Sequence, residues 1–188
     1  MKKSSIGIIV VVGIILILGI ILISNYNGIV ATAEEVDNKF ATIDTYLQRR
    51  ADLIPNLVNT VKGYTQQEQK IVEMITEARE KMVGATSVSE KADANNELTS
   101  ALKNLMVIIE NYPDLKSSEN FIQLSDELAG TENRIAVARR DYNNSVKDYN
   151  LVITKFPNNI LAKMFGFEKK QYFEATENSK EVPNVNFE

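Results

Sequence analysis

The chain lacks cysteine, histidine and tryptophan altogether among its 188 residues. Without cysteine there can be no disulfide, thiolate metal site, thiol nucleophile or acylated lipoprotein cysteine. Without histidine there can be no Ser-His-Asp or Cys-His catalysis, and no HExxH or Glu-x-x-His metal motif. The sequence therefore points away from most catalysis, and it predicts a protein that is not an enzyme and binds no cofactor.

The chain also lacks an excess of positive charge. The formal net charge is −4, and Lys2 and Lys3 contribute +2, so the rest of the chain carries −6. Binding to a phosphate backbone requires clustered Lys and Arg that displace counterions. We therefore expect no nucleic-acid partner.

A long apolar run is present near the N-terminus. Residues 6–23 are eighteen consecutive positions made only of Ile, Val, Leu and Gly. As a helix they would span roughly 27 Å, close to the hydrocarbon thickness of a bilayer. We expect a transmembrane anchor at 6–24 that contacts the lipid bilayer through residues 6–23 and follows a short basic N-terminus at 1–5.

The charges on either side of this run indicate an orientation. Lys2 and Lys3 precede it, and carboxylates at positions 34, 35 and 37 are the first charges after it. The positive-inside rule then predicts a single-pass protein of the bacterial cell membrane with a cytoplasmic N-terminus and a body outside the cytoplasm. The small residues at 31–33 leave a cleaved signal peptide as the alternative. The run exceeds the usual length of a signal-peptide core, which favours a retained anchor.

The rest of the chain has few helix breakers, with five glycines and four prolines outside the apolar run. Apolar residues recur there every three or four positions, the period of an amphipathic helix. Such stripes run from Val36 to Leu47, from Ile54 to Met82 with a polar middle at Thr65 and Glu68, from Leu98 to Ile109, and over 36 residues from Phe121 to Phe156. Residues 84–93 read as a loop, Ser117 or Ser118 as a helix cap, and residues 159–165 as a short helix folded back through Ile160, Leu161, Met164 and Phe165.

Amphipathic helices of this length need partners that cover their apolar stripes. We therefore predict an all-α fold, in which the transmembrane helix is followed by an elongated antiparallel bundle of about four helices at 28–173. Residues 174–188 are polar, and we expect a disordered tail there. Near Pro55 the sequence leaves two alternatives, a kinked helix or a new helix capped by Asp52.

Four motifs occur in order behind the apolar run. They are residues 49–58 (RRADLIPNLV), residues 110–116 (ENYPDLK), residues 131–143 with Thr131–Ala136, Ala138-Arg139 and Tyr142-Asn143, and Tyr149-Asn150 followed by Phe156-Pro157 and Gly166-Phe167. Together they resemble the LemA family of bacterial membrane proteins. This resemblance implies an anchored helical bundle in the cell envelope. It implies no catalytic residue, because no reaction is established for the family as a whole.

Polar residues concentrate in these motifs, and they have two interpretations. They are Arg49, Arg50, Asp52, Asn56, Asn59, Glu132, Asn133, Arg134, Arg139, Arg140, Asp141 and Asn143. The first interpretation is a network of caps and ion pairs between helices, with Arg134 or Arg139 paired to Glu132, Asp141 or Asp52. The second is a polar groove or partner-binding surface at the end of the bundle that holds Arg50, Asp52 and Pro55, with Tyr112 or Tyr142 as an interface anchor.

A carboxylate metal site is a weaker alternative. Glu68, Glu73, Glu77 and Glu80 could line one helix, but a solvated helix surface carries such charges as well, and we assign no metal ligands. Tyr142 and Tyr149 are seven residues apart, on one helix face, and we expect them to pack in the core or an interface.

The leading functional hypothesis is a membrane-anchored envelope protein that acts through contacts with an unidentified membrane or envelope protein, as a scaffold or accessory. The first alternative is self-assembly into homo-oligomers on the membrane. The second is an enzyme of a kind that the sequence does not disclose.

Overall fold

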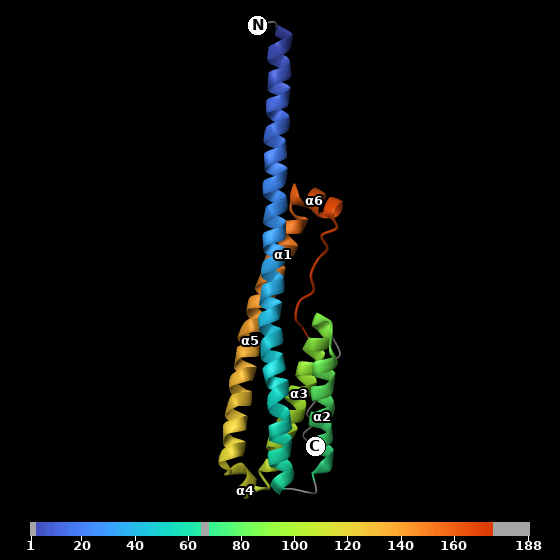
Figure 1. The fold of residues 1–188 in the computed structure, drawn as a ribbon. Helices are drawn as coiled ribbons and strands as arrows, with labels where there is room; N and C mark the ends of the chain where they lie inside the picture. The colour runs from blue at the N-terminus through green and yellow to red at the C-terminus, as the bar shows by residue number, and fades with distance from the viewer. Residues whose placement is uncertain (1–2, 65–67, 175–188) are drawn as a thin grey trace, which may run out of the picture. The chain divides into compact units, whose positions relative to one another are not determined.

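The structure is a computed structural model that describes the backbone of residues 3–64 and 68–174, and the side chains from Gly7 onward in these ranges. Its regular elements are all helices, so the predicted all-α class is confirmed. They are α1 (Lys3–Tyr64), α2 (Gln69–Gly84), α3 (Val88–Ile109), α4 (Pro113–Lys116), α5 (Glu119–Thr154) and α6 (Asn158–Phe165) (Figure 1).

The chain divides into two compact units. The anchor unit comprises residues 1–39 and 144–170, and the bundle unit comprises residues 40–143 and 171–188. The long helices α1 and α5 contribute residues to both units.

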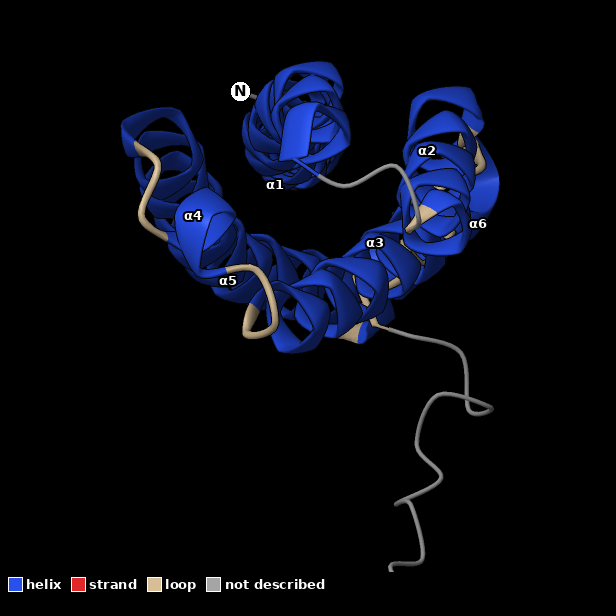
Figure 2. Ribbon diagram, turned by 90° about the horizontal axis from the view of Figure 1, so that it is seen from below, coloured by secondary structure: helices blue, strands red, loops and turns tan. Residues whose placement is uncertain are grey.

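In the bundle unit, α1 contacts α2, α3 and α5. The α1–α5 pair is antiparallel, because the Phe40 ring contacts the Tyr142 ring, whereas Arg49, further along α1, meets Glu127, which comes earlier in α5. Viewed along the helices, α1 lies on the concave side of a curved layer of α5, α3 and α2 (Figure 2). The predicted stripes form the buried interior, which includes Ile43, Leu47, Ile54, Leu57, Ile75, Leu98, Leu105 and Ile135.

The apolar stripe from Ile54 to Met82 is divided between two helices. Helix α1 ends at Tyr64 and α2 begins at Gln69, so the polar middle of this stripe marks a connection between helices. Thr65 lies outside the described residues, whereas the Glu68 carboxylate accepts a hydrogen bond from the Tyr112 hydroxyl at 3.0 Å.

Helix α1 continues without interruption through Pro55. The alternative of a new helix capped by Asp52 is therefore wrong: Asp52 lies within α1, exposed, and accepts a hydrogen bond from Gln48 Nε2 at 2.8 Å. Proline has no N–H to donate to the carbonyl four residues earlier, which belongs to the buried residue Ala51. Arg79 Nε from α2 donates to this carbonyl at 2.9 Å and replaces the missing helix hydrogen bond.

This replacement predicts a coupling between Arg79 and Pro55. Arg79→Met should lower the free energy of unfolding by about 1–2 kcal/mol, because the Ala51 carbonyl is left buried without a donor. In a Pro55→Ala background, residue 55 supplies the missing N–H, so the same substitution should cost clearly less. Urea unfolding followed by far-UV circular dichroism measures all four corners of this double-mutant cycle. Equal costs in both backgrounds would show that Arg79 acts by another contact.

The loop predicted at residues 84–93 is much shorter in the structure. Helix α3 begins at Val88 and not near Leu98, because Ser87 and Glu90 form a capping box. The Glu90 N–H donates to Ser87 Oγ at 3.2 Å, and the Ser87 N–H donates to Glu90 Oε2 at 3.0 Å. The Ser and Thr residues that indicated a loop thus serve as a helix start.

The capping box predicts a pH-dependent contribution to stability. Hydrogen bonds from Ser87 and then from Thr86 lower the pKa of Glu90 from 4.5 to about 2. A carboxyl with a lowered folded-state pKa stabilises the protein above its unfolded-state pKa and loses that effect as the pH falls toward the folded-state value. The stability difference between the wild type and Glu90→Gln should therefore be constant above pH 4.5 and shrink between pH 4.5 and pH 2. Urea midpoints across this range test the prediction, which a pH-independent difference would contradict.

Helix α5 has the predicted length of 36 residues, from Glu119 to Thr154, so it ends before Phe156. The Phe121 N–H donates to Ser118 Oγ at 3.3 Å, which identifies Ser118 as the cap between the two predicted candidates. A single turn, α4, precedes it with Pro113 at its first position, where the missing N–H costs nothing.

In the anchor unit, the N-terminal part of α1 is not covered by protein. Its large apolar side chains between Ile8 and Ile23 are 46–67% exposed. Among the described residues, α1 is the one helix long and apolar enough to cross a membrane, with a mean hydropathy of 3.2 over its most apolar 18-residue window. This part of α1 has the length and composition of a membrane anchor.

Helix α6 also belongs to the anchor unit, and it packs in a different way from the prediction. Leu161 and its neighbour Ala162 are buried, whereas Ile160, Met164 and Phe165 are exposed. The Phe165 ring nevertheless contacts the ring of Tyr26 on α1, with 4.8 Å between the ring centroids. The expectation that all four apolar residues fold back is therefore wrong for Ile160 and Met164.

Candidate functional site

A buried arginine joins three helices of the bundle unit. Arg50 on α1 is 3% exposed, and its Nη1 donates to Asn95 Oδ1 at 2.6 Å and to Thr99 Oγ1 at 2.9 Å, both on α3. The same Nη1 forms an ion pair with Glu132 Oε2 on α5 at 2.5 Å. Arg50 thus connects α1 to α3 and α5.

The buried position of Arg50 disfavours its positive charge. Burial lowers the pKa of Arg50 below its usual value, and the nearby Glu132 opposes this effect. Arg50 Nε and the Asn95 side-chain nitrogen are buried without a hydrogen-bond partner. A buried ionic network of this kind adds more to the specificity of helix pairing than to stability.

This network confirms one part of the first interpretation and corrects the pairing. Glu132 was expected to pair with Arg134 or Arg139 of its own helix. It pairs instead with Arg50 on α1. Arg139 instead lies over the ring of Phe173, with its guanidinium carbon 5.2 Å from the centroid.

The other polar motif residues lie on the surface of the bundle unit. Arg140 pairs with Asp141 at 3.8 Å, which is too weak a contact to organise a site. Asp52, Pro55 and Asn133 are exposed. Arg50 faces the interior while Asp52 and Pro55 face outward, so the surface expected to combine these three residues does not exist.

A surface groove of mixed polarity, which we call the α1/α5 groove, does lie between these two helices. It consists of two adjoining hollows of about 690 and 480 Å³ that share Gln123 and Glu127. Its lining residues are Arg49, Leu53, Asn56, Asn59 and Thr60 from α1, and Glu119, Asn120, Ile122, Gln123, Leu124, Asp126, Glu127, Gly130, Thr131 and Arg134 from α5. The groove therefore contains four of the polar residues that the sequence singled out.

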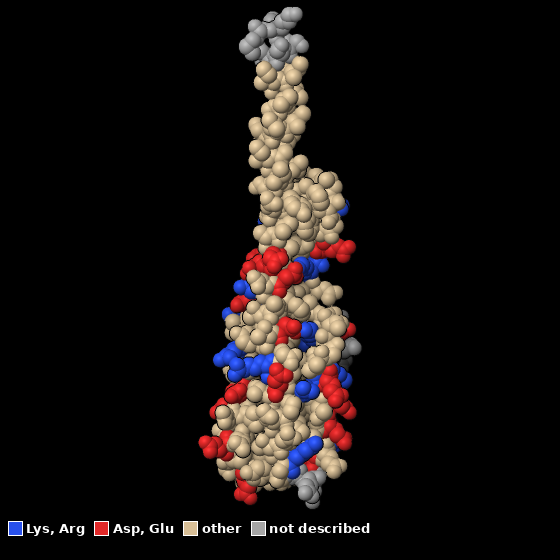
Figure 3. Space-filling model, viewed as in Figure 1, with Lys and Arg blue, Asp and Glu red and all other residues tan. Residues whose placement is uncertain are grey.

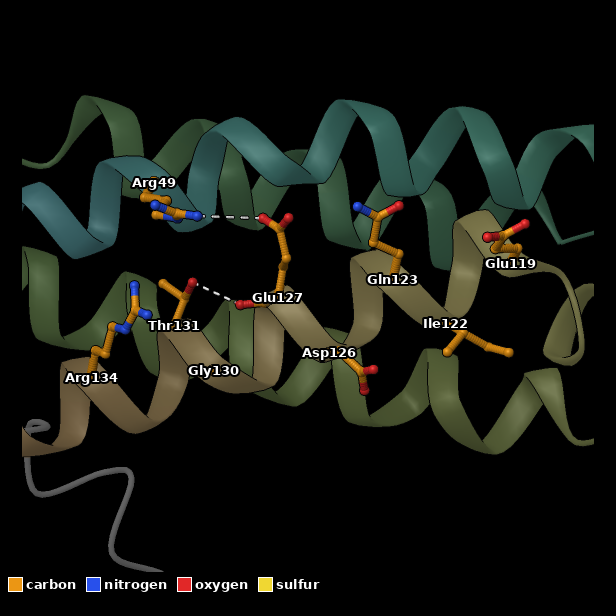
Figure 4. A pocket seen from close by; sticks show the side chains of 9 residues that line it. All are labelled: Arg49, Glu119, Ile122, Gln123, Asp126, Glu127, Gly130, Thr131 and Arg134. Carbon is orange, nitrogen blue, oxygen red and sulfur yellow. Dashed lines mark hydrogen bonds and ion pairs between the residues drawn. The ribbon is translucent and has the colours of Figure 1, made fainter.

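The close view of the larger hollow shows how its side chains are directed. Gln123 and Glu127 point from α5 toward α1, and Asp126 points away (Figure 4). Arg49 reaches from α1 to Glu127, with 3.6 Å between Nη2 and Oε2, and both side chains remain substantially exposed. The groove thus offers both charge signs and side-chain amides, groups that can bond to another polypeptide.

Within the bundle unit, Tyr142 and Asn143 bind the segment that follows Lys170. The Tyr142 hydroxyl donates to the Gln171 carbonyl at 2.8 Å, and the Phe173 N–H donates to Asn143 Oδ1 at 2.8 Å. Asn143 Nδ2 donates in return to the Phe173 carbonyl at 3.4 Å, as in a β-ladder. Tyr142 is also buried, so the packing role expected for it is confirmed.

Within the anchor unit, Tyr149 and Asn150 make the corresponding contacts. The Tyr149 hydroxyl donates to the Glu168 carbonyl at 3.0 Å, and both amide atoms of Asn150 bond to the Lys170 backbone at 2.9 Å. Lys170 Nζ in turn contacts Asp37 and the Ala33 carbonyl of α1. Both Tyr-Asn motifs therefore hold an extended backbone segment, which the sequence did not indicate.

The glutamates considered for a metal do not converge. Glu73, Glu77 and Glu80 are exposed along α2, and Glu68 is bonded to Tyr112. Throughout residues 7–64 and 68–174, no three acidic side chains lie close enough together to hold a metal ion.

Several important residues were not predicted. Asn95 lies three residues before Leu98 on the apolar stripe of α3, and a polar residue at such a position signals a buried hydrogen-bond partner. Thr99 and Arg79 carry no comparable signal, because both lie beside the stripe. The groove residues of α5, such as Gln123, look like any solvated helix face in the sequence.

These features define an all-helical protein whose N-terminal helix carries a segment fit to cross a membrane. The chain belongs to the LemA family, whose family model matches residues 39–187. The resemblance read from the four motifs is thereby confirmed.

Three known proteins are similar to this chain over most of its length. Magnetosome protein MamQ of Magnetospirillum gryphiswaldense and Magnetosome protein MamQ 2 of Paramagnetospirillum magneticum are each 28% identical to this chain, with 79% of the chain matched to 64% of each relative. Protein LemA of Metamycoplasma hominis is 27% identical, with 80% of the chain matched to 69% of that protein. The chain thus spans slightly less than two thirds of the MamQ proteins.

Proposed function

We propose that this protein is a membrane-anchored scaffold or accessory, without catalytic activity, that binds a segment of another envelope protein in the α1/α5 groove. The groove carries the proposal, because it gathers side-chain amides and both charge signs on an exposed face of the bundle unit. Amides such as Asn56 and Gln123 can donate to and accept from a peptide backbone. Anchoring raises the effective concentration of a partner in the same membrane, so modest contacts suffice.

We further propose that the anchor is retained and that the body lies outside the cytoplasm. Cleavage after Ala33 would remove Tyr26, whose ring contacts Phe165, and Ile29, which is fully buried. Lys2 and Lys3 before the apolar run favour a cytoplasmic N-terminus. Digestion of the body by external protease, in cells whose inner membrane is intact, is the expected result. Digestion only after the inner membrane is breached would reverse the orientation.

Site-specific photocrosslinking in intact cells tests the groove. A photoreactive amino acid at Gln123, which both hollows share, should form an adduct with one defined envelope protein. The matched control carries the probe at Lys103, an exposed position on α3 outside the groove. Adding Asn59→Arg to the Gln123 probe should abolish the adduct, because a long charged side chain then occupies the groove.

The same experiment separates the alternatives. An adduct of twice the chain mass would instead favour self-assembly into homo-oligomers. Equal adducts from Gln123 and Lys103, or an adduct that survives Asn59→Arg, would contradict binding in the groove.

A further inference from the structure

The short helix α6 is apolar on two sides. Its inner side is buried through Leu161 and Ala162. Ile160 and Met164, one helical turn apart, are 54% and 71% exposed, and Phe156 in the turn before the helix is 80% exposed. A surface helix normally turns polar residues outward, so an outward apolar stripe needs a second cover.

Contacts within the anchor unit place α6 at one end of the membrane-spanning segment. The Phe165 and Phe167 rings lie 4.8 and 5.9 Å from the ring of Tyr26 on α1. Gly166, at φ 74°, ends the helix in the left-handed conformation and brings Phe167 back toward Tyr26. The C-terminal end of α6 is therefore packed against α1 at Tyr26.

Tyr26 lies three residues beyond Ile23, the last residue of the apolar run, which corresponds to roughly 4.5 Å of helix. The headgroup layer on each side of a bilayer is roughly 5–8 Å thick, and tyrosine is enriched there. Residues 24–33 contain no charged side chain. On the face visible in Figure 3, few charged side chains lie over the upper part of α1 and over α6.

We propose that α6 lies in the headgroup layer of the bilayer that holds the anchor, with Phe156, Ile160 and Met164 inserted among the lipid chains. The lipid surface is the occupant that the geometry favours, because the stripe is held beside the end of the anchor. Exposed Lys155 and Lys163 flank the stripe, and such side chains can extend their ammonium groups to lipid phosphates. The protein would then hold the membrane at two points, the anchor and α6.

The absence of tryptophan makes this proposal directly measurable. Met164→Trp introduces a single fluorophore, and Val107→Trp on α3 is a matched control because these two residues are 71% and 72% exposed. The full chain is reconstituted in phosphatidylcholine vesicles with and without brominated acyl chains. Tryptophan at 164 should lose roughly half its emission in brominated vesicles, since interfacial helices bury their apolar face roughly 5–10 Å deep. Tryptophan at 107 should be unaffected.

Leu16→Trp, within the apolar run, reports separately whether the anchor is inserted. Quenching at 16 without quenching at 164 would overturn the α6 proposal and leave the anchor intact. A blue-shifted but unquenched tryptophan at 164 would also overturn it, because protein and not lipid would then cover the stripe. Loss of quenching at both 16 and 164 would refute anchoring and the α6 proposal together.

Discussion

Arg50→Ala is expected to lower the free energy of unfolding by about 3 kcal/mol, because it breaks a buried network by removing its central cation. Asn95, which is fully buried and already has an unpartnered nitrogen, would lose the donor to its oxygen as well. Glu132 would lose its counterion, although at 36% exposure its carboxylate can recover part of that loss from water. Urea unfolding of the full chain in detergent, followed by far-UV circular dichroism, measures the effect.

The adjacent residue provides the control for this experiment. Arg49 has the same chemistry and lies on the same helix, but it is 54% exposed, and its partner Glu127 is also accessible to water. Exposed ion pairs contribute little, so Arg49→Ala should change stability by about 0.5 kcal/mol or less. Similar losses for the two substitutions would show that burial of Arg50 is not what makes it important.

Phe173→Ala is expected to cost about 3 kcal/mol, although Phe173 lies close to the C-terminal end of the described chain. Its side chain is fully buried under the Arg139 guanidinium, and Asn143 binds its backbone. Truncating a buried phenylalanine loses its transfer free energy and leaves a cavity. The midpoint and slope of urea unfolding give the measured loss.

Tyr172 is the matched control, since it is the preceding aromatic residue and is exposed. Tyr172→Ala should change stability by about 0.5 kcal/mol or less, as most surface substitutions do. If Phe173→Ala were equally mild, the segment after Lys170 would not be an integral part of the bundle unit. The expected order of the two losses therefore tests whether this segment completes the core.

Phe173, the last residue of the predicted bundle, is buried. The tail expected at 174–188 falls almost wholly outside the described residues. How residues 167–173 are held was not predictable, because Tyr142, Asn143, Tyr149 and Asn150 bind backbone atoms there. Backbone carbonyls and N–H groups have no signature in the sequence, so the two Tyr-Asn motifs could be recognised only as a repeated pair on one helix face.

The positions of the helices were predictable from the sequence, but some of their boundaries were not. The apolar stripes located the helices, because burial of an amphipathic face follows from a 3.6-residue period. The same stripes could not separate α1 from α2 or place the start of α3. The capping box of Ser87 and Glu90 sets the start of α3, and Arg79, which satisfies the carbonyl freed by Pro55, allows α1 to continue past that residue.

The sequence by itself determined the apolar segment, the helical class and the family, because each depends on residue type at a fixed spacing along the chain. Only the tertiary structure decided that Arg50 is buried while Arg49 lines the α1/α5 groove. Consecutive residues of a helix point in directions about 100° apart. Whether each direction meets Asn95, Glu127 or water depends on the helices packed around α1.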